Sequence, residues 1–331
     1  MNANSYCLGI ESTAHTFGAS IVSSDGTVLC DVKEIYAPEV GKGIHPREAA
    51  QHHSQVAPEV LRRAFKEARM KPKSLDVIAF SAGPGLGPVL RTGATMARAL
   101  TVYLGKPIVP VNHAIGHIEI GALTTGARDP LVVLVSGGHT AITACADRRW
   151  RVFGETEDIT LGNVLDGFAR EAKLPPPGGS AVEKLALKGK RFIDLPYTVK
   201  GNDVAYSGLL TAALKKLGDH DLEDLCFSIQ EVAFSMLTEA VERSLAHTEK
   251  KEVLLTGGVA ANKRLQSALK VIAEEHSARF YVVDPKYSGD CGAQIAWAGL
   301  LAFKCGVKAK VEDTIVRPKW RLDEVEIPWR S

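Results

Sequence analysis

Two stretches of the chain share one pattern, in which an apolar run is followed by a turn of small polar residues and by a second apolar run. Residues 8–22 read L-G-I-E-S-T-A-H-T-F-G-A-S-I-V, and residues 131–145 read L-V-V-L-V-S-G-G-H-T-A-I-T-A-C. Short apolar runs bounded by such turns predict β-strands. One copy would indicate an ordinary hairpin. Two copies half a chain apart predict two similar halves that each open with strand, turn and strand.

Helices and further strands are predicted between and after these stretches. Apolar residues recur at intervals of three and four over 46–69 and 222–247, which predicts two amphipathic helices. Pro46 suits the first position of the earlier helix, and Pro58 predicts a kink within it. Further short apolar runs predict strands at 76–80, 107–111, 253–256 and 279–283. This alternation of strands and helices places the chain in the α/β class, with a loop-rich stretch at 174–208.

Composition narrows the class of protein only slightly. The chain has 331 residues, which favours two domains, and a net charge of +2, which indicates neither a dedicated nucleic-acid binder nor its absence. Six cysteines never form a C-x-x-C pair, which predicts buried reduced thiols. The start lacks the pattern of a signal peptide, and no apolar run approaches the ~20 residues that span a bilayer. We therefore expect a soluble, cytoplasmic protein.

Two histidines stand four residues apart in V-N-H-A-I-G-H-I-E-I-G, directly after a predicted strand. On a helix, His113 and His117 would face one side with Cβ atoms ~6 Å apart, which suits one shared metal ion. A third ligand is available in Asp290 of Y-S-G-D-C-G-A. The alternatives are ordinary core or surface histidines, and an N-cap role for Asp290 on the helix from Ala293 to Phe303. Two imidazoles and one carboxylate leave open coordination positions, as in catalytic zinc or iron(II) sites.

The histidine spacing argues against a metalloprotease. The H-E-x-x-H motif needs a glutamate directly after its first histidine to activate water. This chain has Ala114 at that position, so the motif H-A-I-G-H supplies no base. Peptide hydrolysis is therefore disfavoured.

Glycine-rich turns indicate a nucleotide site. A Gly-Gly pair lies between a strand and a helix in V-L-L-T-G-G-V-A-A-N-K-R-L at 253–265, and S-A-G-P-G-L-G-P-V-L-R-T-G occupies 81–93. Glycines there let a flat ring or a phosphate approach the backbone. Together with the repeated strand–turn–strand, these turns resemble the ASKHA superfamily of actin, Hsp70 and sugar kinases, in which two duplicated domains close over ATP. We expect an N-terminal lobe, 1–130, with the histidine pair, and a C-terminal lobe, 131–331, with adenylate-binding loops and Asp290.

Linked motifs along nearly the whole chain resemble one family. They are G-I-E-S-T-A-H-T, G-I-H-P-R-E-A-A-Q-H-H, S-A-G-P-G-L-G-P, V-N-H-A-I-G-H-I-E-I-G, V-S-G-G-H-T, Y-S-G-L-L-T, G-G-V-A-A-N and G-D-C-G-A-Q-I-A. The chain resembles the universal tRNA N6-adenosine threonylcarbamoyltransferases, the TsaD proteins of bacteria and the catalytic subunit of the KEOPS complex in archaea and eukaryotes. Its ending, T-I-V-R-P-K-W-R-L-D-E-V-E-I-P-W, is similar to the archaeal and eukaryotic branch.

The resemblance implies one bound metal ion, iron or zinc, and an ATP, AMP or threonylcarbamoyl-AMP ligand. The family's metal ligands correspond to His113, His117 and Asp290. Its adenylate contacts correspond to a second set of residues: Ser136, Gly137, Gly138, Asp166, Gly179, Glu183 and Asn262. Two positions depart from the archaeal and eukaryotic pattern. Leu134 replaces a tyrosine that often reaches the metal there, and His139 replaces an asparagine.

The resemblance also implies a reaction and partners. The family transfers threonylcarbamoyl from threonylcarbamoyl-AMP to N6 of the adenosine 3′ of the anticodon in ANN-reading tRNAs. Glu11 is the candidate for proton acceptance or orientation. Expected partners are tRNA and KEOPS subunits, namely a small protein kinase and a small dimerising subunit; in some relatives the kinase is fused after this domain. Two basic runs, R-R-W-R at 148–151 and K-G-K-R at 188–191, are candidate RNA contacts or ordinary solvated faces.

Two other functions stay open from sequence. One is a sugar-kinase-like phosphotransferase, which needs an aspartate base that no motif marks. The other is a non-catalytic ATP-binding protein whose nucleotide state regulates a complex. The product distinguishes them: modified tRNA, a phosphorylated small molecule, or neither.

Overall fold

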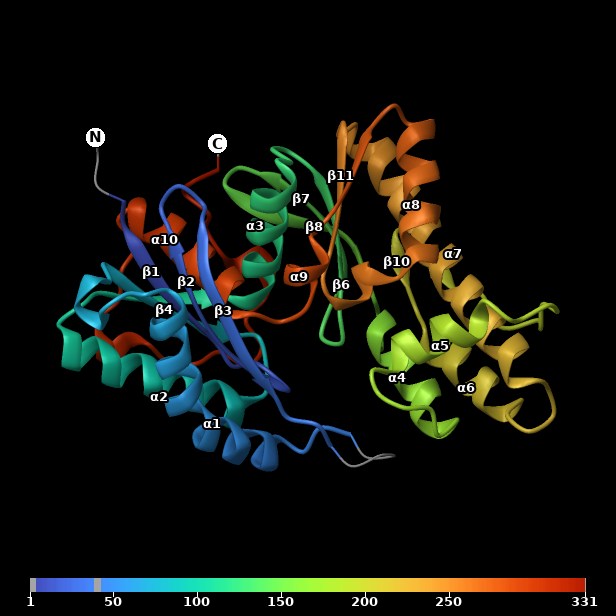
Figure 1. The fold of residues 1–331 in the computed structure, drawn as a ribbon. Coiled ribbons are helices and arrows are strands. Elements are labelled where there is room, and N and C mark those ends of the chain that lie inside the picture. Colours follow the sequence, from blue (N-terminus) through green and yellow to red (C-terminus); the bar gives the residue numbers. More distant parts are fainter. Residues whose placement is uncertain (1–3, 39–42, 331) are drawn as a thin grey trace.

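The structure, a computed structural model, describes residues 4–38 and 43–330 and shows two lobes, each built on a five-stranded sheet (Figure 1). The first sheet has the strand order β3-β2-β1-β4-β5, and the second has the order β12-β11-β6-β7-β8. The first is formed by β1 (Tyr6–Glu11), β2 (Thr16–Ser23), β3 (Val28–Ile35), β4 (Val77–Gly83) and β5 (Ile108–Asn112). The second is formed by β6 (Leu131–Val135), β7 (Thr140–Ala146), β8 (Arg149–Glu155), β11 (Glu252–Thr256) and β12 (Arg279–Val282).

Both sheets are connected in the same way. In each, three consecutive strands pair antiparallel, and the first of them also pairs in parallel with a later strand that carries a further parallel neighbour. The strand–turn–strand predicted at 8–22 and 131–145 is confirmed as β1–β2 and β6–β7. The predicted duplicated α/β architecture is therefore confirmed.

The helices cover the sheets and carry most of the connections. They are α1 (Pro46–Glu67), α2 (Gly87–Leu104), α3 (His113–Thr125), α4 (Leu161–Glu171), α5 (Gly178–Ala186), α6 (Ser207–Lys215), α7 (Leu222–Thr248), α8 (Lys263–Glu275), α9 (Pro285–Ser288) and α10 (Gly292–Lys304). The helices predicted over 46–69 and 222–247 are confirmed as α1 and α7, and α1 continues through Pro58. The stretch 174–208 is less irregular than predicted, because α5 begins directly after Pro177, along with the short strands β9 (Val199–Lys200) and β10 (Asp203–Val204).

Helix α10 follows the second lobe in sequence but packs against the first sheet (Figure 1). The two backbones touch: a Cβ added at Gly9 of β1 would lie 2.2 Å from the Ala296 nitrogen, and one at Gly299 would lie 2.3 Å from Ala79 Cβ. Only glycine permits so close an approach. The predicted lobe 131–331 thus contains a helix that lies on the first sheet, and the chain crosses between lobes just before it, at Asp290.

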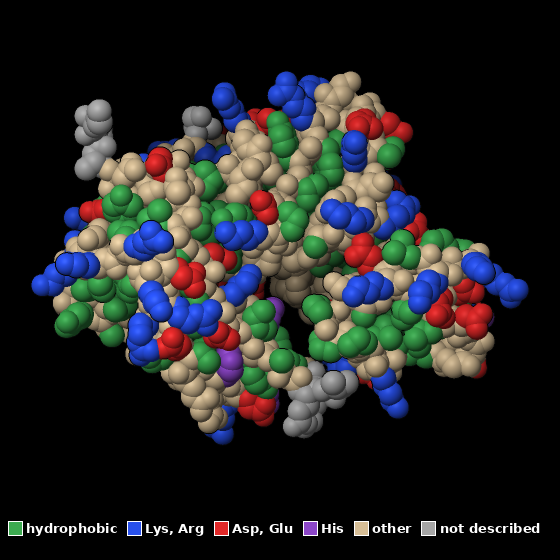
Figure 2. Space-filling view, viewed as in Figure 1, with side chains coloured by type: hydrophobic (Ala, Val, Ile, Leu, Met, Phe, Trp, Pro, Cys, Tyr) green, Lys and Arg blue, Asp and Glu red, His purple; other side chains and the backbone are tan. Residues whose placement is uncertain are grey.

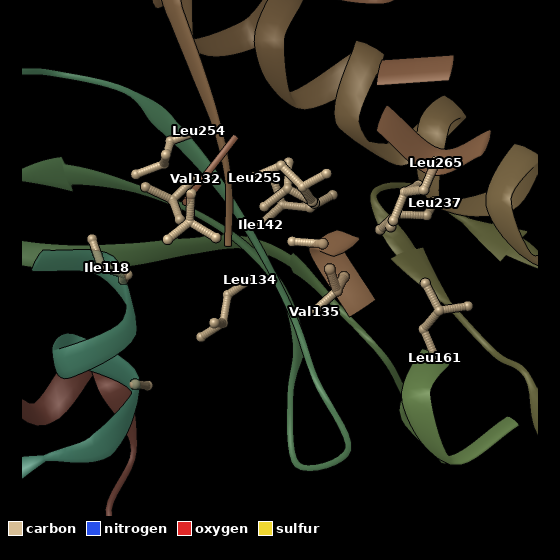
Figure 3. Close-up of a cluster of buried hydrophobic side chains, with 14 of the residues drawn as sticks. Ile118, Val132, Leu134, Val135, Ile142, Leu161, Leu237, Leu254, Leu255 and Leu265 are labelled. Atoms are coloured by element: carbon tan, nitrogen blue, oxygen red, sulfur yellow. The ribbon is translucent and has the colours of Figure 1, made fainter. Parts of the chain in front are cut away.

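The core of the second lobe covers both faces of its sheet, toward α7 and α8 on one face and toward α3 on the other (Figure 3). It is filled by aliphatic side chains from strands and helices, including Val132, Leu134, Ile142, Leu237, Leu254 and Leu265, all at most 2% exposed. Burying a side chain of this size contributes about 1.5–3 kcal/mol. The strands that lead to the candidate site are therefore held in a rigid frame.

The surface between the lobes is hollowed, and a histidine side chain is visible at the edge of the hollow (Figure 2). Basic and acidic side chains are interspersed over the rest of this face, without one dominant charge (Figure 2). None of the helices in the described ranges is both long enough and apolar enough to cross a membrane.

Candidate metal centre and nucleotide site

Helix α3 carries both histidines, and its start is fixed by a side-chain cap. Asn112 ends β5, and its Oδ1 accepts hydrogen bonds from the backbone N–H groups of Ala114 and Ile115, at 3.0 and 3.3 Å. This N-cap begins the helix at His113. His113 and His117 then lie one turn apart with ring centroids 4.6 Å from each other, and both are buried. The predicted helical spacing is present.

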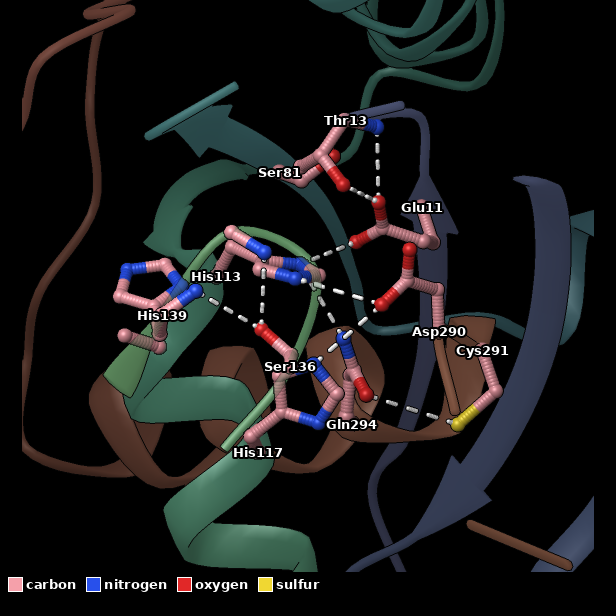
Figure 4. A network of polar contacts seen from close by, with 12 residues as sticks. Glu11, Thr13, Ser81, His113, His117, Ser136, His139, Asp290, Cys291 and Gln294 are labelled. Atoms are coloured by element: carbon pink, nitrogen blue, oxygen red, sulfur yellow. Dashed lines mark hydrogen bonds and ion pairs between the residues drawn. The ribbon is translucent and has the colours of Figure 1, made fainter. Parts of the chain in front are cut away.

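Asp290 faces both imidazoles from the segment between α9 and α10 (Figure 4). Its Oδ1 lies 3.4 Å from His113 Nε2 and 3.3 Å from His117 Nε2. One ligand atom from each of the three residues lies within 4.8 Å of the other two. The N-cap of α10 is Cys291, without a side-chain hydrogen bond, so the alternative reading of Asp290 as the cap is wrong.

The chemistry of this trio fits a dication. The Nδ1 atom of His117 is buried and has no hydrogen-bond partner among the described residues, and its Nε2 faces only the Asp290 carboxylate. Burial opposes ionisation of Asp290, yet the neighbouring imidazoles keep its pKa well below the usual value. Burial alone would lower the pKa of His113, but the carboxylates of Glu11 and Asp290 outweigh it and raise that pKa to about 10. The site favours a positive charge, and two imidazoles with one carboxylate suit zinc or iron(II).

Glu11 holds the ring of His113 from the other side (Figure 4). Its Oε2 lies 3.0 Å from His113 Nδ1, while its Oε1 accepts hydrogen bonds from the Thr13 backbone N–H, at 2.7 Å, and from the Thr13 hydroxyl, at 2.5 Å. A carboxylate on one imidazole nitrogen directs the other nitrogen toward a metal and raises its basicity. This geometry supports the orientation role for Glu11, since the carboxylate is fully buried and touches the ligand His113.

The loop between β6 and β7 lies beside the three ligands (Figure 4). The Ser136 hydroxyl accepts hydrogen bonds from the backbone N–H groups of Gly138 and His139, at 3.2 and 3.0 Å, which folds the loop into a compact turn. Gly137 and Gly138 are exposed. The structure therefore brings the predicted serine and glycines next to the metal ligands.

His139 lies beside the metal ligands, although in the sequence it stands out only as a departure from the asparagine of the archaeal and eukaryotic pattern. Its ring centroid lies 6.4 Å from that of His113, and its buried Nδ1 has no hydrogen-bond partner among the described residues. Burial, with lesser effects of His113 and His117, lowers its pKa to about 3, so the ring is neutral. In the sequence, only its position directly after the Gly137–Gly138 turn could indicate that this histidine belongs to the site.

Leu134 lies inside the second sheet. It is fully buried and pairs with Ala141 of β7 and Thr256 of β11. An aliphatic side chain offers no ligand atom, so the three residues of the trio are the only protein ligands that the described residues bring together.

The remaining predicted adenylate residues lie on α4, α5 and the start of α8. Asp166 Oδ1 accepts a hydrogen bond from the Gly179 N–H at 3.1 Å, and Glu183 Oε1 accepts one from the Lys263 N–H at 2.7 Å. Asn262 caps α8 by accepting from two backbone N–H groups and donates to Gln230 at 3.0 Å. Each residue thus links two neighbouring elements.

Two glycines allow α4 and the segment after β11 to pack closely against the β6–β7 loop. A Cβ at Gly162 of α4 would lie 2.6 Å from the Ser136 carbonyl oxygen, and a Cβ at Gly257 would lie 2.3 Å from that of Val135. The segments that carry the predicted adenylate residues therefore converge on the loop beside the metal ligands. Of the Gly-Gly pair that predicts a nucleotide turn, Gly257 is required by this packing, whereas Gly258 has open space at its Cβ position.

Solved structures with low sequence identity share the fold. HypF from T. kodakarensis aligns over 91% of this chain and 48% of its own, with a TM-score of 0.65 and 15% identity. Component A of the (R)-2-hydroxyglutaryl-CoA dehydratase of Acidaminococcus fermentans covers 91% of this chain and 98% of its own, with a TM-score of 0.57 and 15% identity. The ASKHA fold predicted from the repeated turns is confirmed.

Sequence comparison identifies the family. Residues 27–297 match the family TsaD: tRNA N6-adenosine threonylcarbamoyltransferase. Proteins with this name from Thermofilum pendens and Caldivirga maquilingensis are 55% and 52% identical, over 98% and 97% of this chain and 97% of each relative. A bifunctional tRNA threonylcarbamoyladenosine biosynthesis protein of Methanothermobacter thermautotrophicus is 53% identical over 98% of this chain and 60% of its own length. The chain belongs to the tRNA N6-adenosine threonylcarbamoyltransferase family.

Proposed function

We propose that this chain transfers the threonylcarbamoyl group from threonylcarbamoyl-AMP to N6 of the adenosine 3′ of the anticodon in ANN-reading tRNAs. One observation carries the proposal most directly. His113, His117 and Asp290 converge beside the Ser136–Gly138 turn, so a cation site and a nucleotide turn share one space between the lobes. Family membership supplies the substrate class, and this convergence supplies a place for the reaction.

The reaction exchanges one bond for another. The N6 amine attacks the carbamoyl carbon, the bond from that carbon to the phosphate oxygen breaks, AMP leaves, and the amine loses a proton. Negative charge develops on the carbamoyl and phosphate oxygens. A dication held by His113, His117 and Asp290 would supply electrostatic stabilisation of that charge. The trio therefore needs to be rigid, and the cap at Asn112 and the Glu11 contact provide this rigidity.

Glu11 acts in this scheme as a positioning residue. Both of its oxygens are occupied, one by His113 and the other by Thr13. A carboxylate in that setting fixes the tautomer and the orientation of the imidazole. The role that these contacts assign to Glu11 is therefore the orientation of His113.

We assign the adenylate to the turn and the helices around it. The exposed Gly137 and Gly138 allow a phosphate to approach the backbone closely. Asp166 and Glu183 carry carboxylates that can accept hydrogen bonds from ribose hydroxyls, as acidic residues do in other nucleotide sites. Asn262, at the start of α8, lies next to Lys263, to which Glu183 is bonded. Ser136 and Gly179 complete the predicted contacts.

The expected partners and location are also part of the proposal. The family resemblance indicates a KEOPS-type complex with a small protein kinase and a small dimerising subunit, and a cytoplasmic location. All six cysteines are free, as is typical of proteins in a reducing compartment. Co-purification of the tagged chain from its own cells, followed by identification of the bound proteins, tests the partners.

The decisive experiment supplies threonylcarbamoyl-AMP and unmodified tRNA, with and without a chelator, and measures modified nucleosides by mass spectrometry. We expect His113→Ala to abolish transfer and to lower the bound metal while the chain remains folded, with a lower melting temperature because the buried Glu11 carboxylate loses one partner. His220→Ala, an exposed histidine outside the site, is the matched control. Full transfer by His113→Ala would refute the metal role. A phosphorylated small molecule, or no product at all, would favour the phosphotransferase or the regulatory ATP-binding protein instead.

A further inference from the structure

The segment Arg317–Trp320 forms an exposed basic surface close to the metal ligands. The side chains of Arg317 and Lys319 are exposed, and Arg91 of α2 is exposed beside them. A Cβ added at Gly87 would lie 3.6 Å from both Arg91 Nη1 and Pro318 Cγ, which places Arg91 against this segment. We name Arg91, Arg317, Lys319 and Trp320 the basic platform.

The ends of two strands hold the basic platform in place. The Arg317 N–H donates to the Ala82 carbonyl at 2.7 Å, and the Gly85 N–H donates to the Pro318 carbonyl at 3.1 Å. The Asn112 side-chain amide donates to the Trp320 carbonyl at 3.2 Å. Parallel strands β1, β4 and β5 end at one edge of the first sheet, where ligands of α/β folds bind.

The same edge carries the metal centre. Asn112 is bonded to Trp320 on one side and caps the helix that begins with His113 on the other. Glu11, which orients His113, ends the neighbouring strand β1. The Asn112 side chain therefore connects the basic platform to the helix that carries the metal ligands, and a substrate on the platform lies close to that helix.

The chemistry of the basic platform suits RNA. The Arg317 guanidinium lies over the Trp320 ring, 5.0 Å from its centroid, and the ring itself is packed against the hydrophobic core of the first lobe. One face of the guanidinium is thus covered and the other is available for stacking on an unpaired base. Arg91, Arg317 and Lys319 form no ion pair with any described residue, so their charges are free for phosphates. A hollow of about 460 Å³ lies here, and its lining includes one carboxylate, Glu324.

The basic run at 148–151 lacks these properties. Trp150 is fully buried, so it cannot stack on a base. Arg148 is paired with Glu326 at 3.2 Å, and Arg151 is paired with Asp147 at 3.8 Å. The run at 188–191 is followed by Phe192, which is exposed, but no arginine of the run is stacked on a ring among the described residues, so the run serves as a comparison surface.

We propose that the basic platform docks the anticodon arm of the tRNA substrate. Arg317, supported by Trp320, stacks on an unpaired base of the loop, and Lys319 and Arg91 contact backbone phosphates. This inference rests on the proposed transfer to tRNA, since it identifies the surface that presents the loop to the metal centre.

The test measures binding of the full chain to a labelled anticodon stem–loop by fluorescence anisotropy over a range of salt concentrations, with a loop-free duplex as the comparison probe. Arg317→Lys keeps the charge and removes the flat stacking surface. We expect it to weaken stem–loop binding about tenfold and to leave duplex binding unchanged. Lys319→Gln and Arg91→Gln should each reduce the slope of log affinity against log salt by about 1. Lys188→Gln, in the other basic run, is the matched control.

Several outcomes would overturn the proposal. One is that all three platform variants bind the stem–loop as tightly as the unmodified chain does. Another is that Lys188→Gln loses binding instead, and a third is that the unmodified chain shows no measurable binding. Transfer activity and bound metal are measured on the same preparations. A chain that modifies tRNA while the platform variants bind normally refutes the docking surface alone. A chain that produces no modified tRNA while the variants lose stem–loop binding refutes the proposed function and leaves the docking surface standing.

Discussion

At the scale of single residues, the candidate centre depends on buried polar side chains whose partners fix their orientation. Glu11 is a fully buried carboxylate with three short contacts, to His113 Nδ1 and to two groups of Thr13. A buried charge is tolerated only when it is paired and hydrogen-bonded. The arrangement therefore makes the affinity for a cation depend on a residue that does not itself face the cation.

The first prediction concerns this contact. Glu11→Gln keeps the size of the side chain but removes the negative charge beside His113. We expect the affinity for zinc or iron(II) to fall by about 10- to 100-fold, measured by competition with a chromophoric chelator. Glu34→Gln, on an exposed pair with Arg63, serves as the control and should not change metal affinity. Equal affinities in Glu11→Gln and the unmodified chain would show that the contact does not orient the ligand.

A second residue-scale prediction concerns His53 on α1. The ring is fully buried against Phe17, and burial, with a lesser effect of His52, lowers its pKa to about 4. The folded pKa lies below that of an unfolded imidazole, ~6.5. Protonation therefore favours the unfolded chain, so its contribution to stability is complete above pH 6.5 and is lost as the pH falls toward 4.

Urea unfolding at a series of pH values measures this dependence. The free energy of unfolding should decline between pH 6.5 and 4, and His53→Leu, which cannot titrate and has similar volume, should lose part of that decline. His220→Leu, at an exposed histidine of the second lobe, is the control. An identical pH profile in His53→Leu and the unmodified chain would contradict the assignment.

At the scale of elements, close packing of turns sets the shape of the nucleotide site. The two glycines after β11 have different roles. Gly257 has a φ of +97° and faces the Val135 carbonyl, whereas Gly258 has open space around its Cβ position. The Gly-Gly motif therefore joins one residue required by the fold to one whose small size leaves room for a ligand.

Paired substitutions separate these roles. Gly257→Ala meets both the strained φ and a backbone clash, so we expect a loss of at least about 1–3 kcal/mol of stability. Gly258→Ala should change stability by less than about 0.5 kcal/mol and should weaken adenylate binding instead. Thermal unfolding and calorimetric titration with AMP measure the two effects. Equal stability losses in the two variants would show that Gly258, like Gly257, is required by the packing of the fold.

At the scale of the whole molecule, the segment after α10 connects the two lobes. It is bonded to Ala82 at the first sheet, and further along the Ile327 N–H donates to the Arg148 carbonyl at 2.9 Å in the second lobe. Arg330 is partly buried and forms an ion pair with the buried Glu119 of α3, with N–O distances of 2.7 and 2.8 Å, and it lies over the Trp150 ring. The contact between Arg330 and Glu119 thereby connects the helix that carries both histidines to the end of this segment.

The last prediction tests this tie. Arg330→Met leaves the Glu119 carboxylate buried without its partner, which we expect to cost about 3–5 kcal/mol of stability. Arg148→Met, which breaks the exposed pair with Glu326, should cost at most about 1 kcal/mol. Chemical unfolding of both variants decides the matter. A small and equal effect in the two would mean that the pair of Arg330 and Glu119 does not hold α3 in place.

Local pattern determined a large part of this molecule. The strand–turn–strand at 8–22 and 131–145 follows from apolar runs broken by small polar residues, and a five-stranded sheet forms around each copy. The pairing of His113 with His117 follows from a one-turn spacing after the Asn112 cap. These features depend on neighbours within a few residues, so the sequence displays them.

Only the tertiary structure decided the rest. The packing of α10 on the first sheet requires glycine on both surfaces, Gly9 and Gly299, which no single segment reveals. The crossing between lobes directs Asp290 at the histidines, and the β6–β7 loop brings His139 beside His113. Hydrogen bonds with Asn112 and Ala82 place the basic platform at the same sheet edge. Each of these contacts joins residues far apart in the chain, and their geometry is set by packing between elements, which periodicity along the sequence does not encode.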